Sequence, residues 1–307
     1  MPILERDRWR YQFFDAVACP ADVLIPTDDP DCWTLFPHHR WIYDKLKIAE
    51  TQGLSCGPHG VLPLSYPVFS KPIVNLKGMG IGSRAILSDV EFEQVSTPGH
   101  MWMQLLEGPH VSTDCAIVAG RVAWIRHATG IPWVDGMFRQ WTIHSQPLPP
   151  LEVYLADWIG IHMTGYTGMM NFETIGGRII EAHLRFADQW CDLYGRGWVE
   201  ALIGLYAGKQ WNFTDDQRCD GYSVPLFARH GNGFHHPSPE LQARVRAMPH
   251  IQSLQITFHE AKAANDHPMP PGGFRLAILN ATDLAAAHRA RRVLASAFPS
   301  ESVLDQD

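Results

Sequence analysis

The stretch MMNFETIGGRIIEAHLR, residues 169–185, decides the fold of this chain. Polar side chains flank its double glycine at even spacings: Asn171, Glu173, Glu181 and His183. Side chains alternate between the two faces of a strand, so residues at even separations share a face. With an odd-length loop such as Gly176-Gly177-Arg178, Glu173 faces Glu181 and Asn171 faces His183 across an antiparallel hairpin. The spacing therefore predicts a hairpin with one polar face.

Two carboxylates that face each other in this way indicate a cation between them. Their Cβ atoms would lie about 5 Å apart, and the two charges would repel unless a positive ion sat between them. Mg²⁺ commonly takes one or two carboxylates together with substrate phosphates and water. The pattern thus predicts that Glu173 and Glu181 bind Mg²⁺. Two alternatives stay open: a polar face that is merely hydrated, or a two-residue turn, which would place Glu181 opposite Phe172 and abolish the site.

A second segment, SKPIVNLKGMGIGS at residues 70–83, has the composition of a phosphate-binding loop. Lys71 lies in a predicted strand, and glycines occupy every second position after Lys77. Glycines allow main-chain N–H groups to approach phosphate oxygens, and a lysine supplies positive charge. The segment matches neither the Walker A motif nor the dinucleotide fingerprint. A flexible surface turn with two hydrated lysines is the alternative.

Helices and strands are interleaved along the rest of the chain. Residues 1–37 read as irregular, and apolar periodicity predicts helices over 40–52, near 201–208 and from Thr282 to about Phe298. Strands are expected at residues 67–76, 101–106, 111–119, 121–126, 254–258 and 274–278, and those at 101–106, 111–119 and 121–126 read as antiparallel neighbours. The fold class is therefore predicted to be α+β.

Composition excludes several classes of protein. The 307 residues are 46% hydrophobic and carry a formal charge of −7 without a basic cluster, so no nucleic acid or membrane partner is expected. No apolar run approaches the roughly 18 to 20 residues that a membrane-spanning helix needs. The six cysteines are widely spaced, which is typical of reduced thiols in a cytoplasmic protein.

Four segments in order resemble the ATP-grasp superfamily, and the likeness is strongest to its carboxylase branch, typified by biotin carboxylase. The segments are YDKLKIAETQGLSC, YPVFSKPIVNLKGMGIGS, MWMQLLEGPHVSTDC and NFETIGGRIIEAHLR, within residues 43–185. The resemblance implies an ATP-grasp fold in which two α+β subdomains clamp a nucleotide, with ATP and Mg²⁺ as cofactors. It implies nucleotide contacts from Lys45, Lys71, Lys77, Gly78, Gly80, Gly82, Ser83 and the adenine hinge Gln104, Leu105 and Leu106.

The resemblance also implies roles at the reacting end of the site. Glu173 and Glu181 match the family's metal ligands, His110 matches the histidine after the hinge, and Arg185 matches the arginine beside the reacting acid. Arg139 could reach the terminal phosphate or form a plain ion pair. The chain departs from the family at three places. His183 stands where asparagine is usual, as a weaker metal ligand or a substrate contact. Gln189 replaces the general base, which argues against biotin carboxylation, and the N-terminal domain is reduced to a fragment.

These expectations define three parts of the chain: a reduced N-terminal segment with a linking helix at 1–57, a lid subdomain with the glycine loop at 58–103, and a core subdomain at 104–307. The expected activity is ATP-dependent ligation, in which a small carboxylic acid is activated as an acylphosphate and attacked by an amine or a thiol. A nucleotide-binding module without turnover and a small-molecule kinase remain alternatives. The partners expected are small-molecule substrates, and a homodimer stays open.

Overall fold

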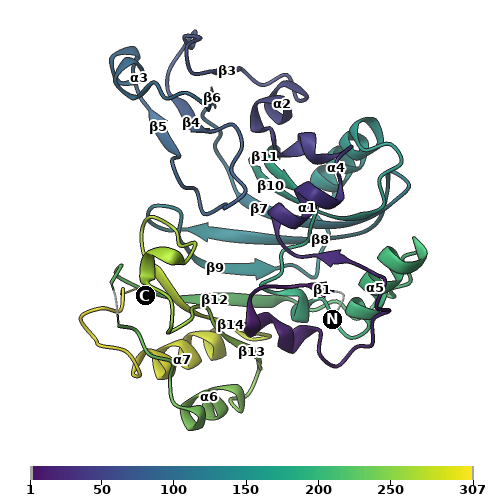
Figure 1. The fold of residues 1–307 in the computed structure, drawn as a ribbon, viewed down its shortest axis with the longest axis vertical. Helices are drawn as coiled ribbons and strands as arrows, with labels where there is room; N and C mark the ends of the chain where they lie inside the picture. The colour runs from purple at the N-terminus through teal and green to yellow at the C-terminus, as the bar shows by residue number, and fades with distance from the viewer. Residues whose placement is uncertain (1–2, 232, 306–307) are drawn as a thin grey trace.

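The computed structural model describes residues 3–231 and 233–305, and it contains a large sheet, a small sheet and helices around both (Figure 1). The large sheet has eight strands in the order β11-β10-β7-β8-β9-β12-β14-β13, and all of its paired neighbours are antiparallel. Its strands are β7 His110–Val118, β8 Arg121–Pro132, β9 Phe138–Ile143, β10 Gly168–Ile175, β11 Arg178–His183, β12 Gly221–Ala228, β13 Ile251–Ile256 and β14 Phe274–Ala281. This mixture of helices and antiparallel strands confirms the predicted α+β class.

The small sheet lies apart from the large one, at the top of Figure 1. It has the order β3-β6-β4-β5, with β3 Cys56–Pro58, β4 Val68–Pro72, β5 Arg84–Ile86 and β6 His100–Gln104. Helix α3, Asp89–Val95, begins at its N-cap Ser88, and buried Phe92 joins the apolar cluster under this sheet. Strand β6 pairs with β3 and β4, so the prediction that it neighbours β7 was wrong. The chain leaves the small sheet after Gln104 and enters the large one at His110.

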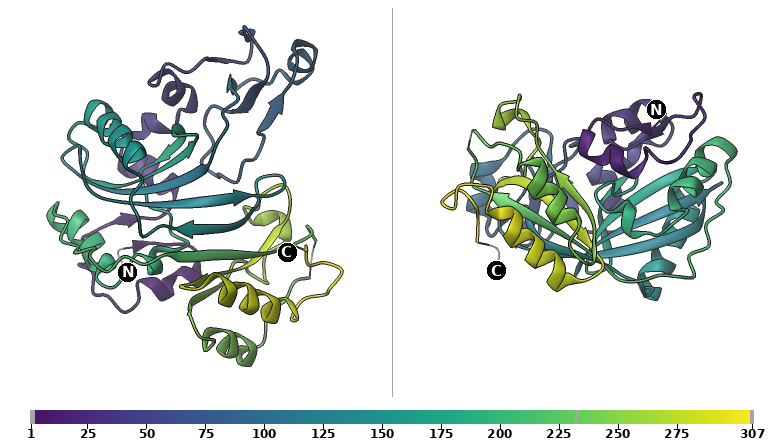
Figure 2. Two further views of the ribbon diagram at one scale, coloured as in Figure 1. Left: turned by 180° about the vertical axis from the view of Figure 1, so that it is seen from behind. Right: turned by 90° about the horizontal axis from the view of Figure 1, so that it is seen from below.

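The N-terminal part covers one face of the large sheet, and helix α7 covers the opposite face (Figure 2). Residues 3–37 hold short elements rather than the irregular chain that we expected over 1–37: β1 Ile3–Leu4, η1 Arg8–Phe13, β2 Ile25–Pro26 and α1 Asp29–Leu35. The helix expected over 40–52 is present in two pieces, η2 Arg40–Tyr43 and α2 Lys45–Glu50. The remaining elements are α4 Pro149–His162, η3 Cys191–Leu193, α5 Trp198–Gly208, α6 Pro239–Arg246, η4 Ala264–Asp266 and α7 Leu284–Ala295. Helix α7 is capped by Asp283, one residue after the predicted cap.

Separate apolar clusters hold these layers together. One joins the N-terminal residues Phe14 and Ile25 to Phe186 and Trp198, all of which are buried. Another packs α1, η2, α2 and α4 against strands β7, β10 and β11, and a third packs α6 and α7 under strands β12–β14. The N-terminal part is therefore integrated into the core and not an appendage. Within the described ranges, no helix has the length and apolar character needed to cross a lipid bilayer.

The hairpin that decides the fold has the predicted pairing but a different turn. Glu173 pairs with Glu181, and Asn171 pairs with His183. The prediction of an odd-length loop was wrong, because Ile175 pairs with Arg178 and leaves Gly176 and Gly177 as a two-residue turn. The ladder then shifts between Glu173 and Thr174, so Ile180 is one extra residue in β11. Such a bulge moves all later residues of its strand by one position, and it returns Glu181 to the face of Glu173.

Candidate active site at the hairpin

A row of polar side chains crosses one face of the sheet on strands β7, β10 and β11. The register of the strands places His110, Ser112 and Asp114 of β7 beside the polar residues of the hairpin: Ile175↔His110, Glu173↔Ser112 and Asn171↔Asp114. Because alternate residues share a face, His110 lies on the same face as Glu173 and Glu181. The sequence signal for this row was present, since His110, Ser112 and Asp114 also stand at even spacings.

Each of the two acidic residues is held by a cationic or ionisable partner. Glu181 Oε1 lies 3.0 Å from Lys45 Nζ, and Glu173 Oε2 lies 2.7 Å from His110 Nε2. Burial would raise the pKa of Glu181, but Lys45, His183 and Lys71 outweigh burial and lower this pKa. Glu181 is therefore a carboxylate at neutral pH. The Glu173 and Glu181 side chains are 21% and 24% exposed, so solvent can reach both.

Two buried lysines approach the hairpin from different segments. Lys45 is the first residue of α2, and Lys71 lies in β4 of the small sheet; they are 6% and 5% exposed. Lys71 Nζ donates a 2.6 Å hydrogen bond to the main-chain oxygen of Ile180, the extra residue of the bulge. Burial lowers the pKa of Lys71 to about 8, and the nearby Lys45 adds to this shift while Glu181 opposes it. The two ammonium groups place positive charge beside Glu181.

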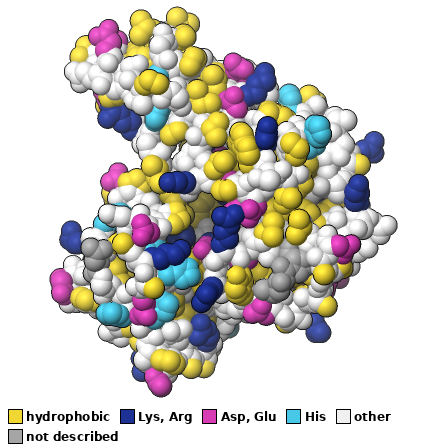
Figure 3. Space-filling model, viewed as in Figure 1, with side chains coloured by type: hydrophobic (Ala, Val, Ile, Leu, Met, Phe, Trp, Pro, Cys, Tyr) yellow, Lys and Arg dark blue, Asp and Glu magenta, His cyan; other side chains and the backbone are white. Residues whose placement is uncertain are grey.

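The glycine loop extends from the small sheet to the core. Gly78, Gly80 and Gly82 have positive φ angles, which glycine adopts without strain, and Met79 between them is also left-handed, with φ of 62°. The loop reaches the turn between β8 and β9, where a Cβ on Gly136 would lie 3.0 Å from the main-chain oxygen of Met79. Lys77 is exposed, and the Ser83 main-chain N–H donates to Gly80. The loop thus crosses from one sheet toward the other, and Figure 3 shows the surface hollowed between the lobe of the small sheet and the rest of the molecule.

The expected adenine hinge follows the last strand of the small sheet. Gln104 ends β6, where its main-chain N–H donates to Ser55 and its side-chain oxygen accepts from the Ser55 N–H. Leu105 is 36% exposed. Leu106 packs on a second apolar cluster, which contains Met101 and Met103 of the small sheet. Arg139 lies in β9 with its guanidinium 5.3 Å from the centre of the Trp133 ring. The hinge contacts and the role of Arg139 stay predictions.

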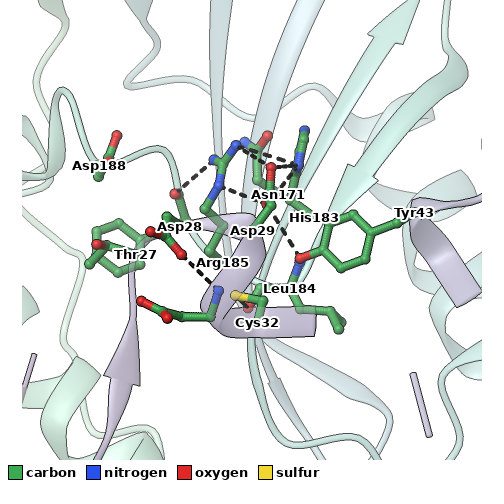
Figure 4. A network of polar contacts seen from close by, with 12 residues as sticks. Thr27, Asp28, Asp29, Cys32, Tyr43, Asn171, His183, Leu184, Arg185 and Asp188 are labelled. Carbon is green, nitrogen blue, oxygen red and sulfur yellow. Dashed lines mark hydrogen bonds and ion pairs between the residues drawn. The ribbon is translucent and has the colours of Figure 1, made fainter. Parts of the chain in front are cut away.

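His183 and Arg185 are joined by a residue that sequence analysis did not single out, Asp29 (Figure 4). Asp29 is the first residue of α1, it is 4% exposed, and its carboxylate accepts from Arg185 Nε at 3.0 Å and from Nη2 at 3.3 Å. Its two oxygens also lie 3.1 and 3.0 Å from His183 Nδ1. Burial would raise the pKa of Asp29, but Arg185 and His183 outweigh burial and lower it. The predicted acid-binding arginine therefore holds a carboxylate of the protein itself.

Helix α1 is fixed in this position by its N-cap and by a contact from its middle. Asp28 caps the helix by accepting from the Asp31 N–H, and Cys32 Sγ, fully buried, donates to the main-chain oxygen of Leu184. Leu184 lies between His183 and Arg185 in the chain, so the helix sits directly over the end of the hairpin. The Tyr43 hydroxyl adds a 3.3 Å hydrogen bond to Asp29.

The donor set at the hairpin fits a magnesium–nucleotide complex. Within residues 3–231 and 233–305 no three His, Cys, Asp or Glu side chains converge as a complete metal cage. Mg²⁺ that binds with a nucleotide needs only one or two protein carboxylates, because phosphates and water supply the other ligands. Glu173 and Glu181, both partly exposed and on one face, meet that requirement. His183 stays a predicted third ligand.

Comparisons with known proteins identify the fold. No protein-family model matches the sequence, and no curated protein matches it either. Among solved structures, phosphoribosylamine–glycine ligase from Thermotoga maritima matches with a TM-score of 0.62 and 13% identity over 95% of this chain and 87% of that one. L-amino acid ligase from Bacillus licheniformis matches with a TM-score of 0.59 and 13% identity over 97% of this chain and 84% of that one.

A carboxylase is also among the similar structures. The biotin carboxylase domain of 2-oxoglutarate carboxylase from Hydrogenobacter thermophilus, solved with MgADP, ADP and bicarbonate, matches with a TM-score of 0.56 and 15% identity over 89% of this chain and 68% of that one. All three are ATP-grasp enzymes. The chain therefore has the ATP-grasp fold, which a carboxylase domain and two ligases share, and this confirms the fold implied by the sequence.

Proposed function

We propose that this chain, which has the ATP-grasp fold, is an ATP-dependent ligase that activates a small carboxylic acid as an acylphosphate for attack by an amine or a similar nucleophile. One observation carries the proposal. Two buried lysines from separate segments, Lys45 and Lys71, converge on the strand that presents the ionised Glu181 opposite Glu173. A triphosphate needs such a combination, because it must be held by positive charge and by a cation on carboxylates at the same time.

In this proposal ATP lies between the two subdomains. Adenine lies against the hinge at Gln104–Leu106, and the phosphates lie between Lys45, Lys71 and the glycine loop at 77–83. Glu173 and Glu181 would hold Mg²⁺, which supplies neutralisation of phosphate charge when it is bound. His110 fixes Glu173 through its 2.7 Å contact. Each of these residues acts by position and charge, which is what phosphoryl transfer demands of a protein.

The proposed reaction consists of a phosphoryl transfer followed by an acyl transfer. The bond between the β-phosphate bridging oxygen and the terminal phosphorus of ATP breaks as an oxygen of the acid forms a bond to that phosphorus, which leaves ADP and an acylphosphate. The amine then attacks the acyl carbon, inorganic phosphate departs, and the amine loses a proton. Arg185 would hold the anionic acid through two parallel hydrogen bonds.

The test is release of ADP from Mg-ATP with pairs of carboxylic acids and amines, followed by mass analysis of the product. Glu181→Gln keeps the shape of the side chain and removes its charge, so we expect ADP release to fall by about 100-fold or more. Glu200→Gln, on the exposed side of α5, serves as the matched control and should keep full activity. Unchanged ADP release in the Glu181 variant would exclude the proposed site.

One observation favours a second candidate, a nucleotide-binding module without turnover. Arg185 already holds Asp29, so the group proposed to bind the acid has a partner within the protein. The same assays separate the candidates. ADP and phosphate release that requires both an acid and an amine identifies a ligase, nucleotide binding without ADP release identifies the module, and a phosphorylated product identifies a kinase.

A further inference from the structure

The hydrogen bonds of His183 determine which of its ring nitrogens carries a proton. Nδ1 lies 3.0 and 3.1 Å from the two oxygens of Asp29, and the same oxygens accept from Arg185. A carboxylate in an ion pair can only accept hydrogen bonds, so Nδ1 must be the donor. The Arg185 Nη2 contact to Nδ1 is longer, at 3.4 Å, and does not compete with this assignment. When His183 binds a metal it must give up one ring proton, and because Nδ1 keeps its proton toward Asp29, the lone pair is then on Nε2.

Nε2 points to the predicted cation site. It lies 3.9 Å from Glu181 Oε1, which is too long for a hydrogen bond. Two ligands of one cation, each with a bond of about 2.1 Å, can be separated by up to about 4.2 Å. Among the described residues, Nε2 makes no hydrogen bond. The ring thus offers a nitrogen lone pair beside a carboxylate oxygen.

We propose that Asp29 is a positioning residue that presents Nε2 of His183 as a nitrogen ligand next to Glu181, so that the cation site of the proposed ligase prefers Mn²⁺ over Mg²⁺. The inference rests on the proposed function, because the nucleotide phosphates complete the site. A carboxylate that accepts from one nitrogen of a histidine and so orients the other toward a metal is a recurrent second layer of metal sites. Mg²⁺ is satisfied by oxygen ligands and water and gains little from an imidazole nitrogen. Mn²⁺ accepts the same oxygen ligands and, as a first-row transition ion, also binds nitrogen, so it can use every ligand of this mixed site.

Lys45 sets how the site is filled. Its Nζ lies 3.0 Å from the same oxygen, Glu181 Oε1, that faces His183. A divalent ion that binds this oxygen therefore competes with the Lys45 ammonium group for the Glu181 carboxylate. Nucleotide phosphates offer Lys45 a replacement partner, so we expect the ion to bind more tightly with ADP than alone.

The experiment measures the ligands of Mn²⁺ directly by pulsed electron paramagnetic resonance of the full chain with Mn²⁺ and ADP. Coupling of the electron spin to a nitrogen nucleus is expected in the wild type and should vanish in His183→Asn. Titrations with ADP should show that this variant loses about 10-fold or more of the ratio of Mn²⁺ to Mg²⁺ affinity. Asp29→Asn should weaken Mn²⁺ binding by about 10- to 100-fold, as expected for loss of an orienting partner.

Two controls keep the inference separate from the fold and from the proposed function. His250→Asn replaces an exposed histidine with positive φ, a conformation that asparagine tolerates, and should leave the nitrogen signal intact. Folding of the Asp29 variant is checked by its melting temperature, and His183→Asn decides the question if that variant does not fold. Mn²⁺ and ADP bound without nitrogen coupling would overturn this inference and leave the proposed function standing. If ADP binds neither with Mn²⁺ nor with Mg²⁺, the inference and the proposed function are both overturned.

Discussion

The ion pair between Asp29 and Arg185 gives the sharpest prediction about stability. Asp29 is 4% exposed, and its carboxylate accepts two hydrogen bonds from the guanidinium. Asp29→Leu removes the counter-ion of a guanidinium that is only 20% exposed, and Arg185→Met leaves the buried carboxylate with His183 and Tyr43 as its partners. Each single change should lower the free energy of unfolding by about 3–5 kcal/mol. The double variant removes both charges, so it should lose at least about 2 kcal/mol less than the sum of the two.

The assay is urea unfolding at pH 7, followed by tryptophan fluorescence, for the four proteins of this cycle. The matched control is the pair Lys47 and Glu50 of α2, separated by 3.5 Å and about half exposed. A cycle on that pair, with Lys47→Met and Glu50→Leu, should give a coupling below about 1 kcal/mol. The reasoning is refuted if the losses in unfolding free energy of Asp29→Leu and Arg185→Met add up to that of the double variant within about 0.5 kcal/mol, because the two sites would then be independent.

Acidification tests the same contact. Because Arg185 and His183 lower the pKa of Asp29, its ion pair stabilises the folded state above the ordinary pKa of an aspartate, near pH 4. This contribution is lost as the pH falls through the lower pKa of the folded state. The double variant has no such group, so its stability relative to the wild type should improve as the pH is lowered below about 4. A constant difference between the two proteins down to pH 2 would contradict the prediction.

Three further outcomes can be measured. Folding lowers the pKa of Lys71 from 10.5 to about 8, so the unfolded chain binds more protons than the folded one between these pH values. The free energy of unfolding of the wild type should therefore rise by about 3 kcal/mol across that range, whereas that of Lys71→Met should not. Urea midpoints at pH 7.5 and pH 10 measure the difference. A Cβ on Gly176 would lie 2.2 Å from a main-chain oxygen, whereas one on Gly177 meets nothing within 4 Å. Gly177→Ala should therefore lose only the roughly 1–2 kcal/mol of a left-handed residue, and Gly176→Ala clearly more, in the same unfolding assay. Lys45→Met should weaken binding of ADP with Mg²⁺ by about 10-fold in calorimetry, while exposed Lys47→Met should not.

The hairpin shows what sequence parity can and cannot predict. Even spacings were enough to place Glu173 opposite Glu181, because a buried face tolerates no slip of one residue. The spacing could not say how the chain satisfies that requirement. A three-residue loop and a two-residue turn followed by a bulge have the same length, and the structure has the second. The resemblance to a known family was correct for the fold because its four segments occur in order.

Contacts between distant segments and one long helix were missed for physical reasons. Asp29 and Arg185 are 156 residues apart in the chain, and no local pattern links a helix N-terminus to the end of a hairpin. Helix α4, for which we predicted no element, begins with two prolines; proline breaks a helix in its interior but is well tolerated in the first turn. Its exposed Val153 and Ile161 also blur the apolar stripe that marks a helix against a sheet.

The extra residue in β11 makes the length of that strand matter more than the identity of Ile180. The group that Lys71 contacts is a main-chain oxygen, which every amino acid possesses, so no substitution at position 180 removes it. The Ile180 side chain meanwhile packs with Met101 and Met103 of the small sheet. Replacing this isoleucine by another apolar residue should leave the attachment between the two sheets in place. Deleting it would leave Glu181 opposite Glu173 in a regular ladder, but it would remove the carbonyl that Lys71 contacts and so detach Lys71 from the hairpin.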